Sequence, residues 1–132
     1  MTGMFNKRSE DDELMLKCIG ETNPHTDQVL VIDARSKVNA QCNRVIGGGY
    51  EHSSYYPNCD IYFGGIDNIH GVRDAYQKCF PIWRDQWECK NYDDIMSKII
   101  TIKWKELLQT ILKVACLVSE TMIIDQKNVL VH

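Results

Sequence analysis

Residues 28–51 read QVLVIDARSKVNAQCNRVIGGGYE and set the expected fold class. The run Val29–Ile32 is apolar and mostly β-branched, which is typical of a buried strand in a parallel sheet. Asp33 ends this run, and a polar segment then leads to the glycine run Gly47–Gly49. Consecutive glycines cost backbone entropy unless the chain bends sharply or approaches another group closely, and a plain surface loop is the alternative. No Gly-Lys-Ser or Gly-Lys-Thr follows, so the pattern excludes a nucleotide-binding P-loop.

Two more apolar runs predict strands, at Asp60–Ile66 and Val129–Val131. Strand, crossover and strand in this order favour an α/β fold with a mainly parallel sheet flanked by helices. Ligands of such sheets bind beyond the carboxyl ends of the strands. These ends fall at Asp33, Asn68 and His132, so we expect the three positions to converge with the glycine run on one edge.

Near the N-terminus, Ser9 followed by acidic residues indicates the start of a short helix, and Gly20 is a plausible end. The spacing of its apolar residues predicts one packed face made by Leu14, Met15, Cys18 and Ile19. Residues 36–44 fit either a helical turn or an ordered loop.

Two longer helices are expected in the second half of the chain. Asn68 can cap a helix that runs to about Cys79 and that Pro81 ends. A period of 3.6 residues then continues for about five turns. It places on one face Trp104, Leu107, Leu108, Ile111, Ala115, Val118 and Met122.

The bulk composition narrows the class of protein. At 132 residues the chain is one domain or a piece of one, and 44% apolar and 25% charged residues are ordinary for a globular domain. A net charge of −3 argues against a nucleic-acid binder. No run is long enough to span a bilayer, and the N-terminus lacks the apolar core of a signal peptide. Without that signal, and with two of them on predicted helical faces, the six cysteines indicate reduced thiols in a cytosolic protein rather than three disulfides in a secreted domain. No Cys-x-x-Cys pair is present, which argues against a structural zinc site.

Short motifs in a fixed order add a more specific indication. They are Lys7-Arg8-Ser9 with Asp11-Asp12-Glu13, Asp33-Ala34-Arg35 with Val38-Asn39-Ala40, Asn43-Arg44, Gly47-Gly48-Gly49-Tyr50-Glu51, Tyr56-Pro57-Asn58-Cys59, Asn68-Ile69-His70 with Arg73, Lys103-Trp104, and Val129-Leu130-Val131-His132. In these motifs the sequence resembles the myotubularin family of phosphoinositide 3-phosphatases over nearly its whole length. The resemblance implies a tyrosine-phosphatase-like α/β domain, of which residues 1–132 form the N-terminal portion, truncated after a core strand and with no second domain.

The resemblance also implies an activity. Members of the family remove the 3-phosphate from phosphatidylinositol 3-phosphate and phosphatidylinositol 3,5-bisphosphate through a cysteinyl-phosphate intermediate. Their Cys-x5-Arg loop is expected directly after His132, so this chain is expected to hold no catalytic residue of its own. No arginine stands six residues after any of the cysteines, Cys18, Cys42, Cys59, Cys79, Cys89 and Cys116. The alternative is a non-catalytic family member that serves as adaptor or regulator of an active partner, since the two kinds differ chiefly in that loop.

Carried over from the family motifs, Asn43, Asn68 and Ile69 match the positions that contact the phosphoinositide headgroup. An asparagine amide can donate a hydrogen bond to a phosphate. Each position also has a structural alternative: Asn68 can simply cap a helix, and Ile69 can simply belong to the core.

Three further residues are expected to support the site. Arg35 and Arg44 are candidates for holding the sheet edge through charged hydrogen bonds, with a surface role as the alternative. His132 is expected to orient the catalytic loop. The resemblance implies no cofactor and no metal. The implied partners are a phosphoinositide lipid, a peripheral membrane surface and other family members as homo- or hetero-oligomer, with no nucleic acid, and the implied location is the cytoplasmic face of endosomal membranes.

Overall fold

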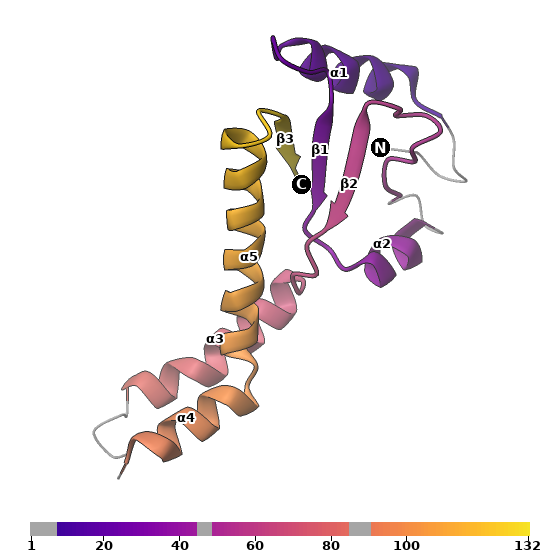
Figure 1. Ribbon diagram of the computed structural model, residues 1–132. Helices are drawn as coiled ribbons and strands as arrows, with labels where there is room; N and C mark the ends of the chain where they lie inside the picture. The colour runs from indigo at the N-terminus through magenta and orange to yellow at the C-terminus, as the bar shows by residue number, and fades with distance from the viewer. Residues whose placement is uncertain (1–7, 45–48, 85–90) are drawn as a thin grey trace. The chain divides into compact units, whose positions relative to one another are not determined.

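The computed structural model describes residues 8–44, 49–84 and 91–132 of the chain (Figure 1). The elements in these ranges are, in order, α1 (Glu10–Glu21), β1 (Val29–Asp33), α2 (Lys37–Arg44), β2 (Cys59–Phe63), α3 (Ile69–Arg84), α4 (Tyr92–Thr101), α5 (Trp104–Ile123) and β3 (Asn128–Val131). The chain divides into two compact units, which are Met1–Gly65 with Val114–His132 and Ile66–Lys113. The predicted glycine run lies mostly outside the described residues.

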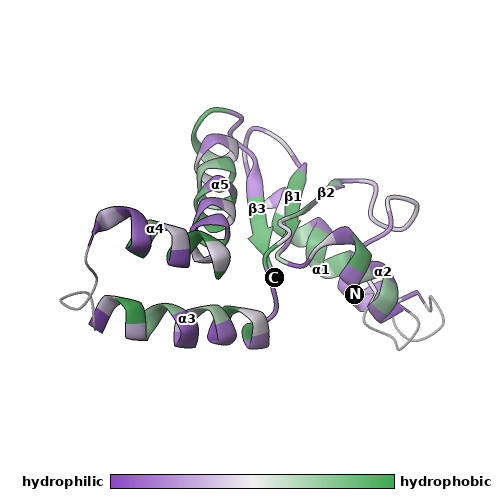
Figure 2. Cartoon of the chain, turned by 90° about the horizontal axis from the view of Figure 1, so that it is seen from below, coloured by the Kyte–Doolittle hydropathy of each residue, from purple (hydrophilic) through white to green (hydrophobic). Residues whose placement is uncertain are grey.

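The first unit is built on a three-stranded sheet in which β1 lies between β2 and β3. Both strand pairs are parallel, with Val29 opposite Cys59 on one side and opposite Asn128 on the other. Figure 2 shows the hydrophobic residues of β1 at the centre of this sheet. The α/β fold with a parallel sheet flanked by helices is therefore confirmed.

The second strand ends earlier than the sequence predicted. It is Cys59–Phe63 rather than Asp60–Ile66. The Gly64 N–H still donates to the carbonyl of Asp33, at 2.7 Å, as the last bond of the parallel ladder. Gly65 has a φ of +67°, which lies in the left-handed region and cannot continue a strand.

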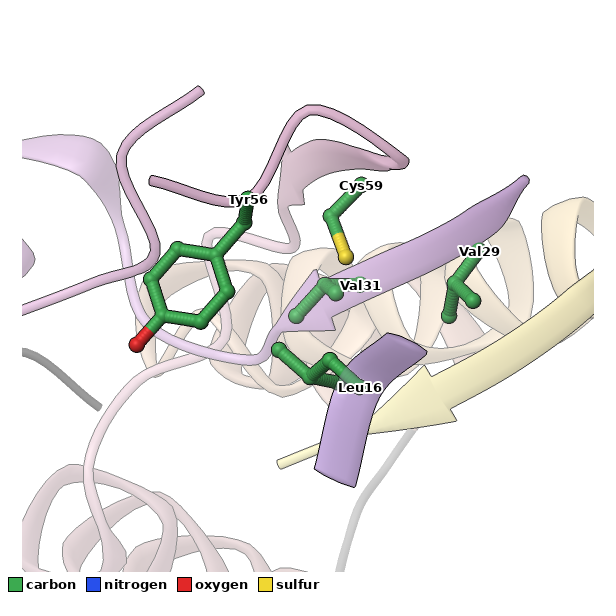
Figure 3. Packing of buried hydrophobic residues seen from close by; sticks show 5 residues of the cluster. All are labelled: Leu16, Val29, Val31, Tyr56 and Cys59. Atoms are coloured by element: carbon green, nitrogen blue, oxygen red, sulfur yellow. The ribbon is translucent and has the colours of Figure 1, made fainter. Parts of the chain in front are cut away.

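One face of the sheet carries the hydrophobic core of the first unit (Figure 3). Its members are at most 6% exposed and come from α1, β1 and the segment that leads into β2: Leu16, Val29, Val31, Tyr56 and Cys59. Burying a side chain of this size contributes about 1.5–3 kcal/mol, so this cluster supplies much of the stability of the unit.

α1 forms where expected, and Ile19 of the predicted face packs against the core, but the buried side of the helix is centred on Leu16. The Oγ of Ser9 caps it by accepting from the Asp12 N–H. Leu14 and Met15 of the predicted face are 60% and 53% exposed, whereas Leu16 is 2% exposed. The reason is the close approach at Gly20, where a Cβ would overlap the carbonyl oxygen of Asp27. This approach turns the Leu16 side of the helix toward the sheet.

α5 shows a similar correction. Of the predicted face, Leu108, Ile111 and Met122 are 42%, 39% and 57% exposed. The buried positions are instead Val114 and Thr121, and Val114 lies against the backbone at Gly64.

The second unit contains α3, α4 and the first part of α5. α3 continues to Arg84, so the prediction that Pro81 ends the helix near Cys79 is wrong. A proline inside a helix removes a single hydrogen bond, here the one to the Gln77 carbonyl, and a 16-residue helix retains the others. Aromatic contacts join α3 to α5, with the Tyr76 ring centroid 6.2 Å from that of Trp104. Among the described helices none is both long and apolar enough to cross a bilayer.

Candidate functional site

The carboxyl ends of the strands in the first unit are joined by backbone hydrogen bonds. The N–H of His132 donates to the Ile32 carbonyl at 3.0 Å, and the His132 carbonyl accepts from the Ala34 N–H at 2.8 Å. The Gly64 N–H bonds the Asp33 carbonyl on the opposite side of β1. The chain segments that follow β1, β2 and β3 therefore leave the sheet along one edge.

A buried ion pair marks the centre of this edge. Asp33 is 1% exposed, and Arg35 holds its carboxylate in a bidentate arrangement, with Nε to Oδ1 at 2.9 Å and Nη2 to Oδ2 at 2.6 Å. The same guanidinium also donates to the carbonyl of Gly49 at 3.3 Å. Arg35 thus ties the end of β1 to the segment that follows the glycine run.

Electrostatics favour the ionised form of this pair. Burial is the largest influence on the Asp33 carboxyl and acts to raise its pKa, but the hydrogen bonds and charge of Arg35 together outweigh burial and hold the pKa below its ordinary value. The pKa of the Arg35 guanidinium is raised, chiefly by the hydrogen bonds to Asp33, and the nearby charge of Glu51 adds to the shift.

A second buried carboxylate, Glu51, was not singled out by the sequence. Its residue is 5% exposed, and its Oε2 lies 3.6 Å from Nε2 of His132. The only sequence signal was its place at the end of the Gly-Gly-Gly-Tyr-Glu motif. The structure brings Glu51 together with two predicted supporting residues, Arg35 and His132.

Arg44 is connected to the same edge by contacts with the aromatic ring of Tyr50. It ends α2, and its guanidinium lies 6.0 Å from the ring centroid of Tyr50, within cation–π range. Tyr50 in turn packs edge-on against Phe63, the last residue of β2, with 5.3 Å between centroids. Asn43 precedes Arg44 in the last turn of α2 and is half-buried.

The other predicted headgroup residues, Asn68 and Ile69, lie in the second unit. The Asn68 Oδ1 caps α3 by accepting from the N–H groups of His70 and Gly71, at 2.9 and 3.0 Å. Ile69 is 64% exposed, which rules out the core role considered for it. Asn43 therefore belongs to one unit, and the pair Asn68 and Ile69 to the other.

The structure gives no nucleophilic character to the buried thiol of Cys59, which begins β2 at the amino ends of the strands. Burial raises the pKa of Cys59 to about 11, with smaller contributions from the charges of Glu51 and Asp60. A thiol with this pKa is protonated and unreactive at neutral pH. Within residues 8–44, 49–84 and 91–132, no three His, Cys, Asp or Glu side chains lie close enough to hold a metal ion.

A groove of about 590 Å³ also lies in the first unit, between α1 and the turn before β2. Its lining includes Arg8, Glu13, Lys17 and Tyr55. None of the predicted site residues lines this groove, so its size alone does not make it the site.

Comparisons with known proteins agree with the α/β fold and with the family that the sequence motifs indicate. The family described as "Myotubularin-like phosphatase domain" matches residues 1–132. Myotubularin of Xenopus laevis is 35% identical over 132 residues, which are 100% of this chain and 21% of that protein. The human phosphatidylinositol-3,5-bisphosphate 3-phosphatase MTMR8 is 32% identical over 128 residues, 97% of this chain and 18% of its own length. The mouse phosphatidylinositol-3,5-bisphosphate 3-phosphatase MTMR4 is 35% identical over 122 residues, 92% of this chain and 10% of its own. The chain thus spans about a fifth or less of the length of these relatives.

Proposed function

Because this chain belongs to the family of myotubularin-like phosphatase domains, we propose that it forms part of the catalytic domain of a phosphoinositide 3-phosphatase. The proposed reaction removes the 3-phosphate from phosphatidylinositol 3-phosphate and phosphatidylinositol 3,5-bisphosphate through a cysteinyl-phosphate. The observation that carries this proposal is the match of the family over residues 1–132, together with relatives named as 3-phosphatases of phosphatidylinositol 3,5-bisphosphate.

The nucleophile is proposed to follow His132 directly. A cysteine at that position would lie where the chain leaves the sheet, at the edge formed by Asp33, Arg35 and Glu51. A thiolate at a helix N-terminus, surrounded by backbone N–H groups and an arginine, has a lowered pKa and a ready site for phosphoryl oxygens. In this arrangement Arg35 and Arg44 support the edge, and His132 orients the loop.

Asn43, Asn68 and Ile69 are proposed to contact the inositol phosphate. For Asn68, the contacts allow the side-chain amide to cap the helix with its oxygen and to bind the phosphate with its nitrogen. Its Oδ1 is occupied by the helix cap, so its Nδ2 is the group that can donate to a phosphate. The N-terminus of α3, where Asn68 and Ile69 lie, is also the positive end of the helix dipole, which favours an anion.

The test separates the cap from the substrate contact. In the protein that carries this chain and the residues after His132, we expect Asn68→Ala to lower kcat/KM for a short-chain phosphatidylinositol 3-phosphate by roughly ten- to a hundred-fold, the loss typical of one hydrogen bond to a charged group. Asn68→Asp should lower it further, because a carboxylate repels the phosphate, while the thermal unfolding midpoint stays unchanged, because aspartate is an equally good cap.

The matched control is Asn91→Asp, which alters the cap of α4 in the same way, since the Asn91 Oδ1 accepts from the Asp94 N–H at 2.8 Å. This variant should keep wild-type activity. Full activity of Asn68→Asp would show that Asn68 is only a cap. A folded wild-type protein that releases no phosphate would instead favour the non-catalytic adaptor.

The substrate also suggests where the protein works. Because a phosphoinositide resides in a bilayer, we propose peripheral association with endosomal membranes from the cytoplasmic side, and association with copies of itself or with other family members. Co-sedimentation with vesicles that contain phosphatidylinositol 3-phosphate tests the first proposal, and light scattering of the purified protein tests the second.

A further inference from the structure

The buried carboxylate of Glu51 needs an explanation that the proposed function does not provide. Residues 49–58 form neither helix nor strand, yet Glu51 within them is only 5% exposed. An ionised carboxylate is costly to bury unless opposite charge or hydrogen-bond donors face it. Glu51 is therefore held at this position by the groups around it.

Among the described residues, four ionisable groups either lie beside Glu51 or respond to its charge. They are Arg35 after β1, His132 after β3, and Tyr56 and Cys59 at the entry to β2. Tyr56 and Cys59 are neutral at physiological pH, since burial raises their pKa values to about 12 and about 11. In the described part of the chain, the Arg35 guanidinium, whose pKa the Glu51 charge raises, and the His132 ring, whose Nε2 is 3.6 Å from Oε2, lie beside Glu51.

The two side chains are directed differently. The Nε and Nη2 of Arg35 are directed at both oxygens of Asp33, at 2.6–3.1 Å. The Nε2 of His132 lies 3.6 Å from Oε2 of Glu51, which is an ion-pair distance when the ring is protonated. His132 is therefore a direct neighbour of the Glu51 carboxylate.

His132 is held at its backbone as well as at its ring. Its N–H bonds the Ile32 carbonyl, and its carbonyl bonds the Ala34 N–H. With the ring beside Glu51, both the backbone and the side chain of His132 have partners. In the proposed phosphatase, where the nucleophile follows His132, these contacts would set the direction in which the chain enters the catalytic loop.

We propose that Glu51 is a positioning residue for the phosphatase reaction that acts through His132, by holding its imidazole and thereby the exit of the chain from β3. The proposal rests on the proposed function, because it gives Glu51 a role only if the catalytic loop follows His132. It assigns to Glu51 no contact with substrate.

The kinetic test is a double-mutant cycle in the protein that carries this chain and the residues after His132. We expect Glu51→Gln, which keeps the size of the side chain and removes the charge, to lower kcat for short-chain phosphatidylinositol 3-phosphate about ten-fold or more and to change KM less than about two-fold. The double variant with His132→Asn should be no slower than His132→Asn alone, within about two-fold, because both changes remove the same contact between Glu51 and His132.

The control variant is Glu21→Gln, which removes the carboxylate of an exposed ion pair with Lys17. It should match the wild type in kcat and in KM. A purely structural role for Glu51 predicts a lower unfolding midpoint and an activity loss that follows the unfolded fraction. It also predicts that the fold-losses in kcat of the two single variants multiply in the double variant. Either that multiplication or an unchanged kcat in Glu51→Gln overturns the proposal.

A second measurement does not depend on activity. In ¹⁵N–¹H spectra of the full chain, Glu51→Gln should shift the ring signals of His132 and leave those of His70, which lies in the other unit, in place. Unmoved His132 signals overturn the proposal while leaving the proposed function intact. A wild-type protein that is folded and hydrolyses no phosphoinositide overturns the proposed function, and the positioning role fails with it.

Discussion

At the scale of single residues, the bond between Arg35 and Asp33 is the interaction with the largest expected effect. The carboxylate is 1% exposed and the guanidinium 29%. Arg35→Met leaves a buried charge without its main partner, which typically costs about 3–5 kcal/mol of the free energy of unfolding. Urea denaturation measures this loss. Lys98→Met, which breaks an exposed pair with Asp94, is the matched control and should cost about 0–1 kcal/mol. Equal losses in the two variants would contradict the buried-pair description.

The same pair predicts a dependence on pH. The folded state lowers the pKa of Asp33, so its contribution to stability is present above the unfolded pKa of about 3.9 and is lost as the pH falls through the folded-state pKa. The difference in unfolding free energy between the wild type and Arg35→Met should therefore be largest near neutrality and narrow as the pH falls toward and below about 4. Chemical denaturation at a series of pH values measures it, and a constant gap from pH 7 to pH 2 would contradict the assignment.

Residue identity alone could predict part of this site. The ends of the strands, Arg35 and His132 follow from the apolar runs and from the family motifs. Glu51 could not be predicted, because a glutamate after a glycine run is ordinarily solvated, and only the fold of residues 49–58 carries it into the interior. Asn68 shows the opposite case, since its capping role was evident from the sequence and the structure bears it out.

At the scale of elements, α1 offers a direct test of which face packs. Leu16→Ala should lower the free energy of unfolding by about 2–5 kcal/mol, because it opens a cavity beside β1. Leu14→Ala should change it by less than about 0.5 kcal/mol, because Leu14 is 60% exposed. Thermal or urea unfolding of the two variants distinguishes them, and a larger loss in Leu14→Ala would restore the face that the sequence predicted.

The helices show why the spacing of apolar residues predicts where a helix forms better than it predicts which face of the helix packs. Both α1 and α5 form where the apolar spacing places them, and their bounds differ by only a few residues. Their packed faces differ in part from the prediction because each helix carries apolar residues on more than one side, and the choice depends on close tertiary contacts that glycines allow. Gly20 decides it for α1, and Gly64 receives Val114 of α5. Such contacts depend on tertiary structure and leave no local pattern.

At the scale of the whole molecule, residues 1–132 alone should release no phosphate from phosphatidylinositol 3-phosphate. No cysteine in the chain is followed six residues later by arginine, and the buried thiol of Cys59 is protonated at neutral pH. Covalent catalysis and stabilisation of the transition-state charge are therefore both missing. A phosphate-release assay with the purified chain measures this. Release above the buffer background that a cysteine substitution abolishes would contradict it.

The order of strands in the sheet also bears on how the protein is made. β1 is synthesised early, yet one of its two neighbours is β3, and the Asn128 side chain bonds the Ile19 carbonyl 109 positions away. Pairings between such distant segments raise the contact order and slow folding. At about 5–20 residues per second, the ribosome needs roughly 5–20 s to produce the residues between these strands. During that time the β3 side of the central strand is an open hydrogen-bonding edge, which is the kind of surface that chaperones protect in nascent chains.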